Sequence, residues 1–87
     1  MARFAYIYFM TNDPARVRSL APQHTEHWHG LNLSGYTGGP FADRSGGLIT
    51  FLADESAQAE EAVAEDPFVR EGLIERSWLK QWEPVAR

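Results

Sequence analysis

Two segments of the chain are hydrophobic at both alternating sets of positions, a pattern typical of strands covered on two faces. In residues 3–10 the two sets are Phe4, Tyr6, Tyr8 and Met10, and Ala5, Ile7 and Phe9. In residues 47–53 they are Leu48, Thr50 and Leu52, and Ile49 and Phe51. We therefore expect the first segment to be a central strand and the second to be covered on both faces as well.

The segment after the first strand has the signals of a helix in two parts. Asp13 can cap its start, and Pro14 suits the first helical position. We expect one or two turns over residues 15–20, an interruption at Pro22, and the main first helix over residues 24–33.

A second helix is expected after the strand at residues 47–53. It runs over residues 57–65, with Asp54 or Ser56 as its cap and Pro67 at its end. Six of the twelve acidic residues of the chain lie between Asp54 and Asp66, where there is no Lys or Arg. We interpret this cluster as the solvated outer face of the helix.

Two further strands complete the pattern, a short one at residues 35–38 and a last one at residues 73–85. In the last strand, Trp78 and Trp82 lie on the side opposite Leu79, and we expect them in the core or in a dimer interface. The order is β-α-β-β-α-β, which predicts an α+β fold of the split βαβ plan, with an antiparallel sheet and both helices on one side.

Two helices can cover only one face of such a sheet. The strands at residues 3–10 and 47–53 are nevertheless hydrophobic on both faces, so a monomer would expose an apolar surface. A second copy packed sheet to sheet would cover it, and would also support a short chain that has no disulfide. The sequence thus predicts a homodimer through the sheet faces.

Composition limits the kind of protein that this chain can be. With 87 residues we expect a single domain over residues 1–87. Because the chain has no cysteine, a thiol nucleophile and a cysteine-based zinc module are excluded. The net charge of −4 argues against a nucleic-acid partner, and no apolar run approaches the roughly 20 residues of a membrane span. We expect a soluble cytoplasmic protein with no membrane partner.

Three histidines within six residues, His24, His27 and His29, form the densest titratable cluster. His24 and His27 are one helical turn apart and could share a metal ion with Glu26, but this is not the i, i+4 spacing of established helical zinc motifs. We therefore expect no metal and no cofactor, and the sequence leaves open whether His27 or His29 contributes to a site.

Asp66 is the second candidate, because it stands where the acidic helix ends. A carboxylate there meets the negative end of the helix dipole, which is unfavourable by up to about 1 kcal/mol. Asp before Pro is also a common turn former, which would explain the residue without any function. In a split βαβ fold the start of the first helix and the end of the second need not be distant, so a pair of His24 and Asp66 is feasible. In such a pair the imidazole takes a proton and the carboxylate fixes its tautomer.

Several short motifs follow one another in an order that resembles the YCII-related family. They are Pro22-Gln23-His24, Gly38-Gly39-Pro40, Gly46-Gly47-Leu48-Ile49, Ala64-Glu65-Asp66-Pro67-Phe68-Val69 and Gly72-Leu73-Ile74-Glu75. The resemblance implies a ferredoxin-like dimeric α+β barrel and an active site with a His–Asp dyad, in which the His is His24 and the Asp is Asp66. Members of the family are associated with lyase-type or hydrolytic chemistry, including dehydrochlorination.

Four further residues are expected around the substrate. Tyr8 can donate its hydroxyl to a developing oxyanion, although an aromatic core or dimer-face residue is the simpler interpretation. The backbone at Gly38 and Gly39 can pass close to other groups. Phe68 either lines the pocket wall beside Asp66 or packs in the core.

Two hypotheses follow for the function. In the first, the chain is a cofactor-free enzyme that uses His24 and Asp66 for elimination or hydrolysis of a small polar or phenolic substrate. In the second, the same pocket only binds a small molecule, as in an accessory protein. The sequence does not identify the substrate.

Overall fold

The structure is a computed structural model that describes residues 1–85. Its elements in chain order are β1 (Ala2–Met10), α1 (Pro14–Gly30), β2 (Thr37–Pro40), β3 (Gly46–Ala53), α2 (Ser56–Ala64), α3 (Pro67–Arg70) and β4 (Ile74–Gln81). The strands form an antiparallel sheet in the order β2-β3-β1-β4. The predicted ferredoxin-like α+β fold is thereby confirmed, with β1 and β3 in the centre of the sheet.

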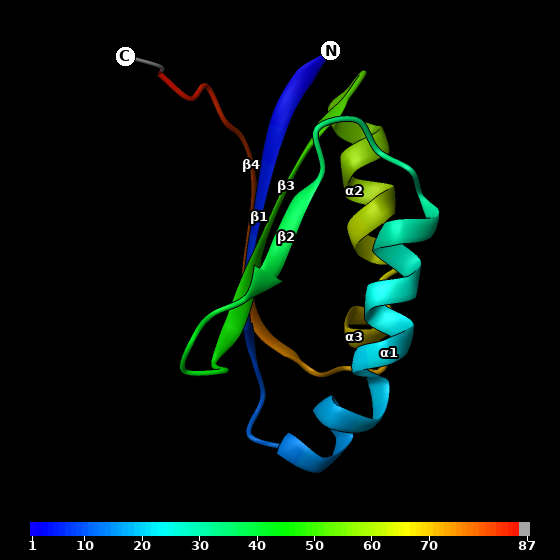
Figure 1. Ribbon diagram of the computed structural model, residues 1–87, viewed down its shortest axis with the longest axis vertical. Helices are drawn as coiled ribbons and strands as arrows, with labels where there is room; N and C mark the ends of the chain where they lie inside the picture. The colour runs from blue at the N-terminus through cyan, green and yellow to red at the C-terminus, as the bar shows by residue number, and fades with distance from the viewer. Residues whose placement is uncertain (86–87) are drawn as a thin grey trace.

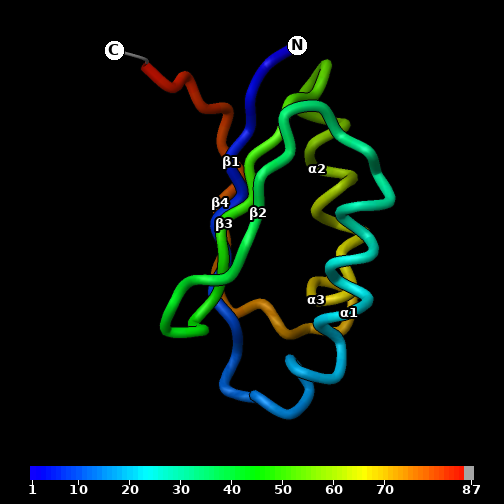
Figure 2. Tube along the Cα trace, viewed as in Figure 1, coloured from blue at the N-terminus to red at the C-terminus, as the bar shows by residue number. Residues whose placement is uncertain are grey.

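All three helices lie on one face of the sheet: α1 connects β1 to β2, and α2 and α3 together connect β3 to β4 (Figures 1 and 2). The core lies between these two layers. Trp28 of α1 packs on Tyr6 of β1 and Phe51 of β3, with ring centroids 6.1 and 5.6 Å apart, and all three side chains are buried. This aromatic contact fixes α1 against the two central strands.

Helix α1 is one continuous helix, so the predicted interruption at Pro22 is wrong. Pro22 lies inside the helix, and Figure 1 shows the first part of α1, in blue, at an angle to the cyan part. A proline removes one backbone hydrogen bond and bends a helix without having to end it, when packing on both sides holds the rest. The start is as predicted, because Asp13 accepts a hydrogen bond from the Arg16 backbone and Pro14 follows it. No helix within residues 1–85 has the length and apolar character of a membrane span.

The edge strands differ from the prediction in their bounds. Strand β2 begins at Thr37 rather than residue 35, because Gly35 adopts a φ of +62° and ends the preceding turn. Pro40 is accommodated in β2 because this strand is at the edge of the sheet. Strand β4 ends at Gln81, short of the predicted residue 85.

The segment around the second helix also differs. Glu55, rather than Asp54 or Ser56, precedes α2 as its cap residue, and it makes no side-chain capping bond. Pro67 does not simply stop α2: it is the first residue of a further short helix, α3, which the sequence pattern did not predict.

The face of the sheet away from the helices has an apolar row, as the alternation in β1 predicts, with the cations Arg76 and Lys80 on either side of it in β4. Ile7 lies opposite Leu48 on one side and Trp78 on the other, so the three form a row across three strands. Leu48 is 40% exposed and Trp78 is 44% exposed. Trp82 is half-exposed as well, so neither tryptophan belongs to the core of this chain.

Gly47 of β3 leaves room for the side chain of its pairing partner in β1. It is paired with Tyr8, whose ring leans over it. A Cβ atom at Gly47 would lie 2.7 Å from Cζ of Tyr8 and 2.8 Å from the carbonyl oxygen of Gly39. These distances are too short for any side chain, so the position of the Tyr8 ring requires glycine here.

We predict that Gly47→Ala lowers the free energy of unfolding by about 1–3 kcal/mol, because the Tyr8 ring and the β2 backbone must both shift. Gly39→Ala is the matched control, since a Cβ there meets nothing within 4 Å. We expect the control to change stability by no more than about 0.5 kcal/mol. Urea denaturation of both variants tests this. Equal losses of unfolding free energy would contradict the close contact of position 47 with the Tyr8 ring and the β2 backbone.

Candidate functional site

Asp66 occupies the junction between α2 and α3 and is completely buried. The sequence predicts Asp66 at the C-terminal, unfavourable end of the second helix, and this prediction is wrong. Helix α2 ends at Ala64, and Asp66 is the N-cap of α3, where its side chain accepts a hydrogen bond from the Phe68 backbone at 2.8 Å. The carboxylate therefore lies at the favourable, positive end of the next helix.

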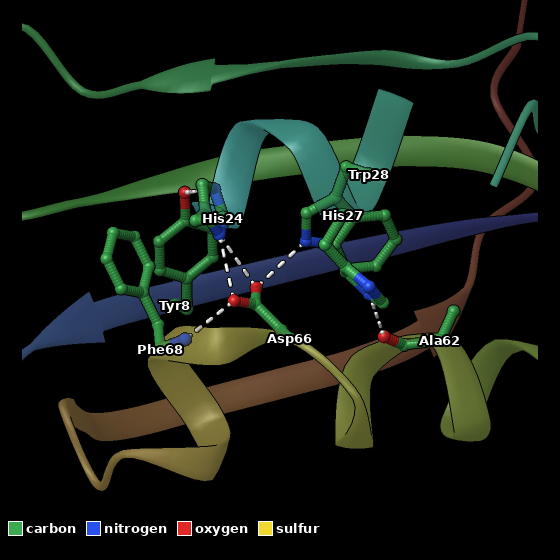
Figure 3. A network of polar contacts seen from close by, with 7 residues as sticks. All are labelled: Tyr8, His24, His27, Trp28, Ala62, Asp66 and Phe68. Atoms are coloured by element: carbon green, nitrogen blue, oxygen red, sulfur yellow. Dashed lines mark hydrogen bonds and ion pairs between the residues drawn. The ribbon is translucent and has the colours of Figure 1, made fainter. Parts of the chain in front are cut away.

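Three N–H groups donate to the Asp66 carboxylate, as Figure 3 shows. His24 Nδ1 lies 2.9 Å from Oδ2 and 3.0 Å from Oδ1, Trp28 Nε1 lies 2.8 Å from Oδ2, and the Phe68 amide completes the set. His24 and Trp28 reach one acceptor because residues four apart on a helix share a face. The donors compensate the cost of burying the charge.

The same contacts orient the His24 ring. With Nδ1 donating to Asp66, the free lone pair of the neutral imidazole is on Nε2. Nε2 lies 3.3 Å from the Tyr8 hydroxyl, and the ring stacks on Phe68 with centroids 4.3 Å apart. The His24 side chain is 13% exposed and that of Asp66 is 1% exposed. His24 is thus the member of the pair that a small molecule can reach.

His27 and His29 make no hydrogen bond to Asp66 and have other contacts. Nε2 of His27 donates to the carbonyl oxygen of Ala62 at 2.8 Å, which ties α1 to α2 (Figure 3). The His29 ring packs edge-on against Tyr36, with centroids 5.7 Å apart. Within residues 1–85 no three His, Asp or Glu side chains are close enough together to hold a metal ion. The three histidines are neighbours in sequence but have separate surroundings.

A cleft of about 780 Å³ opens in front of His24. It is lined by all four residues that the sequence analysis placed around a substrate, Tyr8, Gly38, Gly39 and Phe68. His29 also lines it, whereas His27 faces a smaller cavity of about 250 Å³. A mainly apolar cleft of this size, with a few polar groups, is typical of sites for small organic molecules.

Tyr8 keeps its proton in this environment. Burial raises the pKa of Tyr8, and the negative charge of Asp66 raises it further. The same two causes raise the pKa of Tyr6, the neighbouring residue on this face of β1. Tyr8 is therefore a neutral hydroxyl that can donate a hydrogen bond to His24 or to a bound molecule.

Sequence reasoning missed two residues that determine this geometry. Trp28 shares a helix face with His24, and that spacing was a visible signal for a contact with the same partner. Gly47 had no comparable signal, because its importance depends on the ring of Tyr8 across the strand pair. Both residues position the polar groups, and neither has a reactive atom.

The comparison with known families identifies the chain. A model of the YCII-related domain matches residues 1–83. The chain belongs to the YCII-related family. No curated protein matches this YCII-related protein significantly.

A solved structure shares the fold of this YCII-related protein. It is 5-chloro-2-hydroxyhydroquinone dehydrochlorinase (TftG) from Burkholderia phenoliruptrix AC1100, in complex with 2,5-dihydroxybenzoquinone. The TM-score is 0.81, with 20% sequence identity, and the match covers 93% of each chain. At this identity the similarity establishes the common fold.

The raised tyrosine pKa values predict a loss of stability in alkali. Above pH 10 the unfolded chain loses its tyrosine protons at their ordinary pKa, whereas the folded protein still holds those of Tyr6 and Tyr8. Stability therefore falls as the pH rises above 10, by about 1.4 kcal/mol per pH unit for each such tyrosine.

In the parent, the free energy of unfolding falls between pH 9 and pH 11. We expect Tyr6→Phe to remove the contribution of Tyr6, so that this fall is smaller by about 1.4 kcal/mol than in the parent. Tyr36→Phe serves as the comparison, because Tyr36 is only partly buried, and we expect a smaller change. Guanidinium titrations at both pH values measure the difference. If the free energy of unfolding of Tyr6→Phe depends on pH as in the parent, the raised pKa of Tyr6 is contradicted.

Proposed function

We propose that this YCII-related protein is a cofactor-free enzyme in which His24 acts as general base and then as general acid, positioned by Asp66. One observation supports this above the others: Nδ1 of His24 is held against a buried carboxylate, Nε2 lies at the Tyr8 hydroxyl, and both His24 and Tyr8 line the cleft. The partner of Nε2 is the Tyr8 hydroxyl at 3.3 Å, a long hydrogen bond that a bound substrate can replace. The proposed substrate is a small polar or phenolic molecule.

In the proposed reaction, Nε2 of His24 takes a proton from a C–H or O–H group of the substrate. The electron pair of that bond forms a new double bond, and a leaving group departs from the substrate with its own bonding pair. Asp66 stabilises the imidazolium that forms, and His24 then releases the proton to the leaving group or to water. The Tyr8 hydroxyl can donate to the substrate oxygen that gains negative charge.

The structural neighbour favours elimination over hydrolysis as the reaction class. It is named as a dehydrochlorinase, and its structure contains 2,5-dihydroxybenzoquinone, a small polar molecule. The alternative proposal is that the cleft binds a small molecule without converting it. In that case His24 only hydrogen-bonds the ligand, and a bound compound is recovered unchanged.

We predict that His24→Ala and Asp66→Asn each lower kcat/KM by about 10²–10⁴-fold for a compound found by screening hydroxylated and chlorinated aromatics. The kcat/KM of the double variant should be at most about tenfold below that of the less active single variant, because the two residues act as one unit. Chloride release or the ultraviolet spectrum of the product follows the reaction.

His27→Ala is the matched control for these variants, since His27 lies on the same helix but outside the cleft. We expect it to keep the parental kcat/KM. Parental turnover by His24→Ala would refute the proposed base. Binding of many compounds without conversion of any of them would favour the accessory-protein alternative.

We also propose that two copies pair through the open face of the sheet. The row of Leu48, Ile7 and Trp78 leaves large apolar side chains in contact with water on a face that no helix covers within residues 1–85. Burial of such a surface is favourable by roughly 25 cal/mol per Å². A self-complementary pair of sheets is the simplest way to achieve it.

We predict that sedimentation at micromolar concentration gives twice the chain mass of 9.8 kDa. Leu48→Lys should raise the dissociation constant of the dimer at least tenfold, because a two-fold interface buries the new charge twice. Leu31→Lys is the control, since Leu31 is equally exposed at 39% but follows α1 on the helical side. A monomeric parent, or equal effects of the two variants, would contradict this interface.

A further inference from the structure

Two arginines line the same cleft as His24. Arg18 comes from α1, and Arg44 comes from the turn between β2 and β3. Within residues 1–85 no carboxylate lies at ion-pair distance from either guanidinium. Arg16, by contrast, pairs with Glu71 at 3.4 Å and does not line the cleft. Arg18 and Arg44 are therefore available to a ligand.

The backbone at Arg44 is unusual for an arginine. Its φ is +64°, in the left-handed region where glycine is the less costly residue. Asp43 supports the turn by accepting hydrogen bonds from the Ser45 backbone at 3.0 Å and from the Ser45 hydroxyl at 2.7 Å, and these bonds lower the pKa of Asp43. A strained backbone position that places a long cationic side chain beside a cleft indicates a role of that side chain in binding a ligand.

The residues that line the cleft carry a net positive charge, although the chain is negative and Asp66 lies behind His24. The protein has a net charge of −4, yet the cleft lining contains Arg18 and Arg44 against one acid, Glu75. Glu75 itself lies 3.9 Å from Arg76. A cleft with an excess of positive charge and low-polarity walls concentrates anions.

The walls of the cleft select the rest of the ligand. Tyr8, Tyr36 and Phe68 are aromatic, and Val17 and Ile49 add aliphatic surface. Flat aromatic walls suit a planar apolar body. A guanidinium is a planar fork that matches the two oxygens of a carboxylate.

From these observations we propose that the cleft binds an aromatic carboxylate, with the carboxylate held by Arg18 and Arg44 and the ring placed against the aromatic wall beside His24. This inference rests on the proposed function only in taking the cleft as the substrate site. It narrows the substrate class from small polar or phenolic molecules to those that carry a carboxylate.

Benzoate and benzamide are suitable probes, because they have the same shape and differ in charge. We expect titration calorimetry and ¹H–¹⁵N spectra to show benzoate binding at least tenfold more tightly than benzamide, with shifts at His24 and Phe68. Raising the ionic strength should weaken benzoate alone. Equal affinities of the two compounds would overturn the proposal, as would displacement of benzoate by inorganic phosphate at the same ionic strength.

Substitutions identify the cations involved. We expect Arg18→Gln and Arg44→Gln each to weaken benzoate binding about tenfold, and Arg44→Lys to recover part of the loss because it keeps the charge. Arg16→Gln is the matched control on the same helix and should bind benzoate like the parent. Parental binding by Arg18→Gln and Arg44→Gln, or an equal loss in Arg16→Gln, would overturn the assignment. Thermal unfolding of each variant shows whether Arg44→Gln still folds, and Arg18→Gln tests the proposal independently.

The results separate this inference from the proposed function. Arginine-dependent binding of benzoate together with parental turnover by His24→Ala would leave the anion site in place and remove the proposed catalysis. Equal binding of benzoate and benzamide together with a large loss in His24→Ala would remove the anion site and leave the dyad.

Discussion

The end of the molecule that contains the cleft depends on one buried carboxylate. Asp66 accepts hydrogen bonds from α1 through His24 and Trp28, and from its own segment through the Phe68 amide. Burying a charge costs several kcal/mol unless donors replace the lost water. Because the donors belong to two separate helices, α1 and α3 must meet before the carboxylate is satisfied. The interaction that compensates Asp66 is therefore also the one that brings the His24 ring to the cleft.

The sheet determines the other half of the site by steric means. Tyr8 reaches His24 because Gly47, its partner across the strand pair, has no side chain. On the same face of β1, Tyr6 packs against Trp28, so the residue that donates to Asp66 is also part of the core. Core packing and the polar network thus share side chains. A change in the packing of Trp28 would be transmitted directly to the acceptor that orients His24.

Much of the fold could be predicted because its signals are local. The double hydrophobic alternation in β1 and β3 predicted central strands, and Asp13-Pro14 predicted the start of α1. The continuity of α1 through Pro22 could not be predicted, because it depends on packing of the flanking turns. The role of Asp66 as the cap of α3 was missed for a similar reason, since a four-residue helix has too few residues to show a period. The proximity of His24 and Asp66 was expected from the topology and the family resemblance, and the part of Trp28 required the structure.

The dual role of Asp66 affects how the site can be analysed. A helix as short as α3 has almost no intrinsic stability, so its cap and its contacts hold it in place. The same Oδ1 atom that accepts from Phe68 also lies against His24, and Phe68 in turn stacks on the His24 ring. Loss of the whole side chain would therefore release the cap, the stacking partner and the imidazole together. An asparagine keeps an oxygen that can cap α3 but removes the charge that stabilises an imidazolium. The difference between these two kinds of substitution separates the contribution of Asp66 to local structure from the proposed contribution to proton transfer.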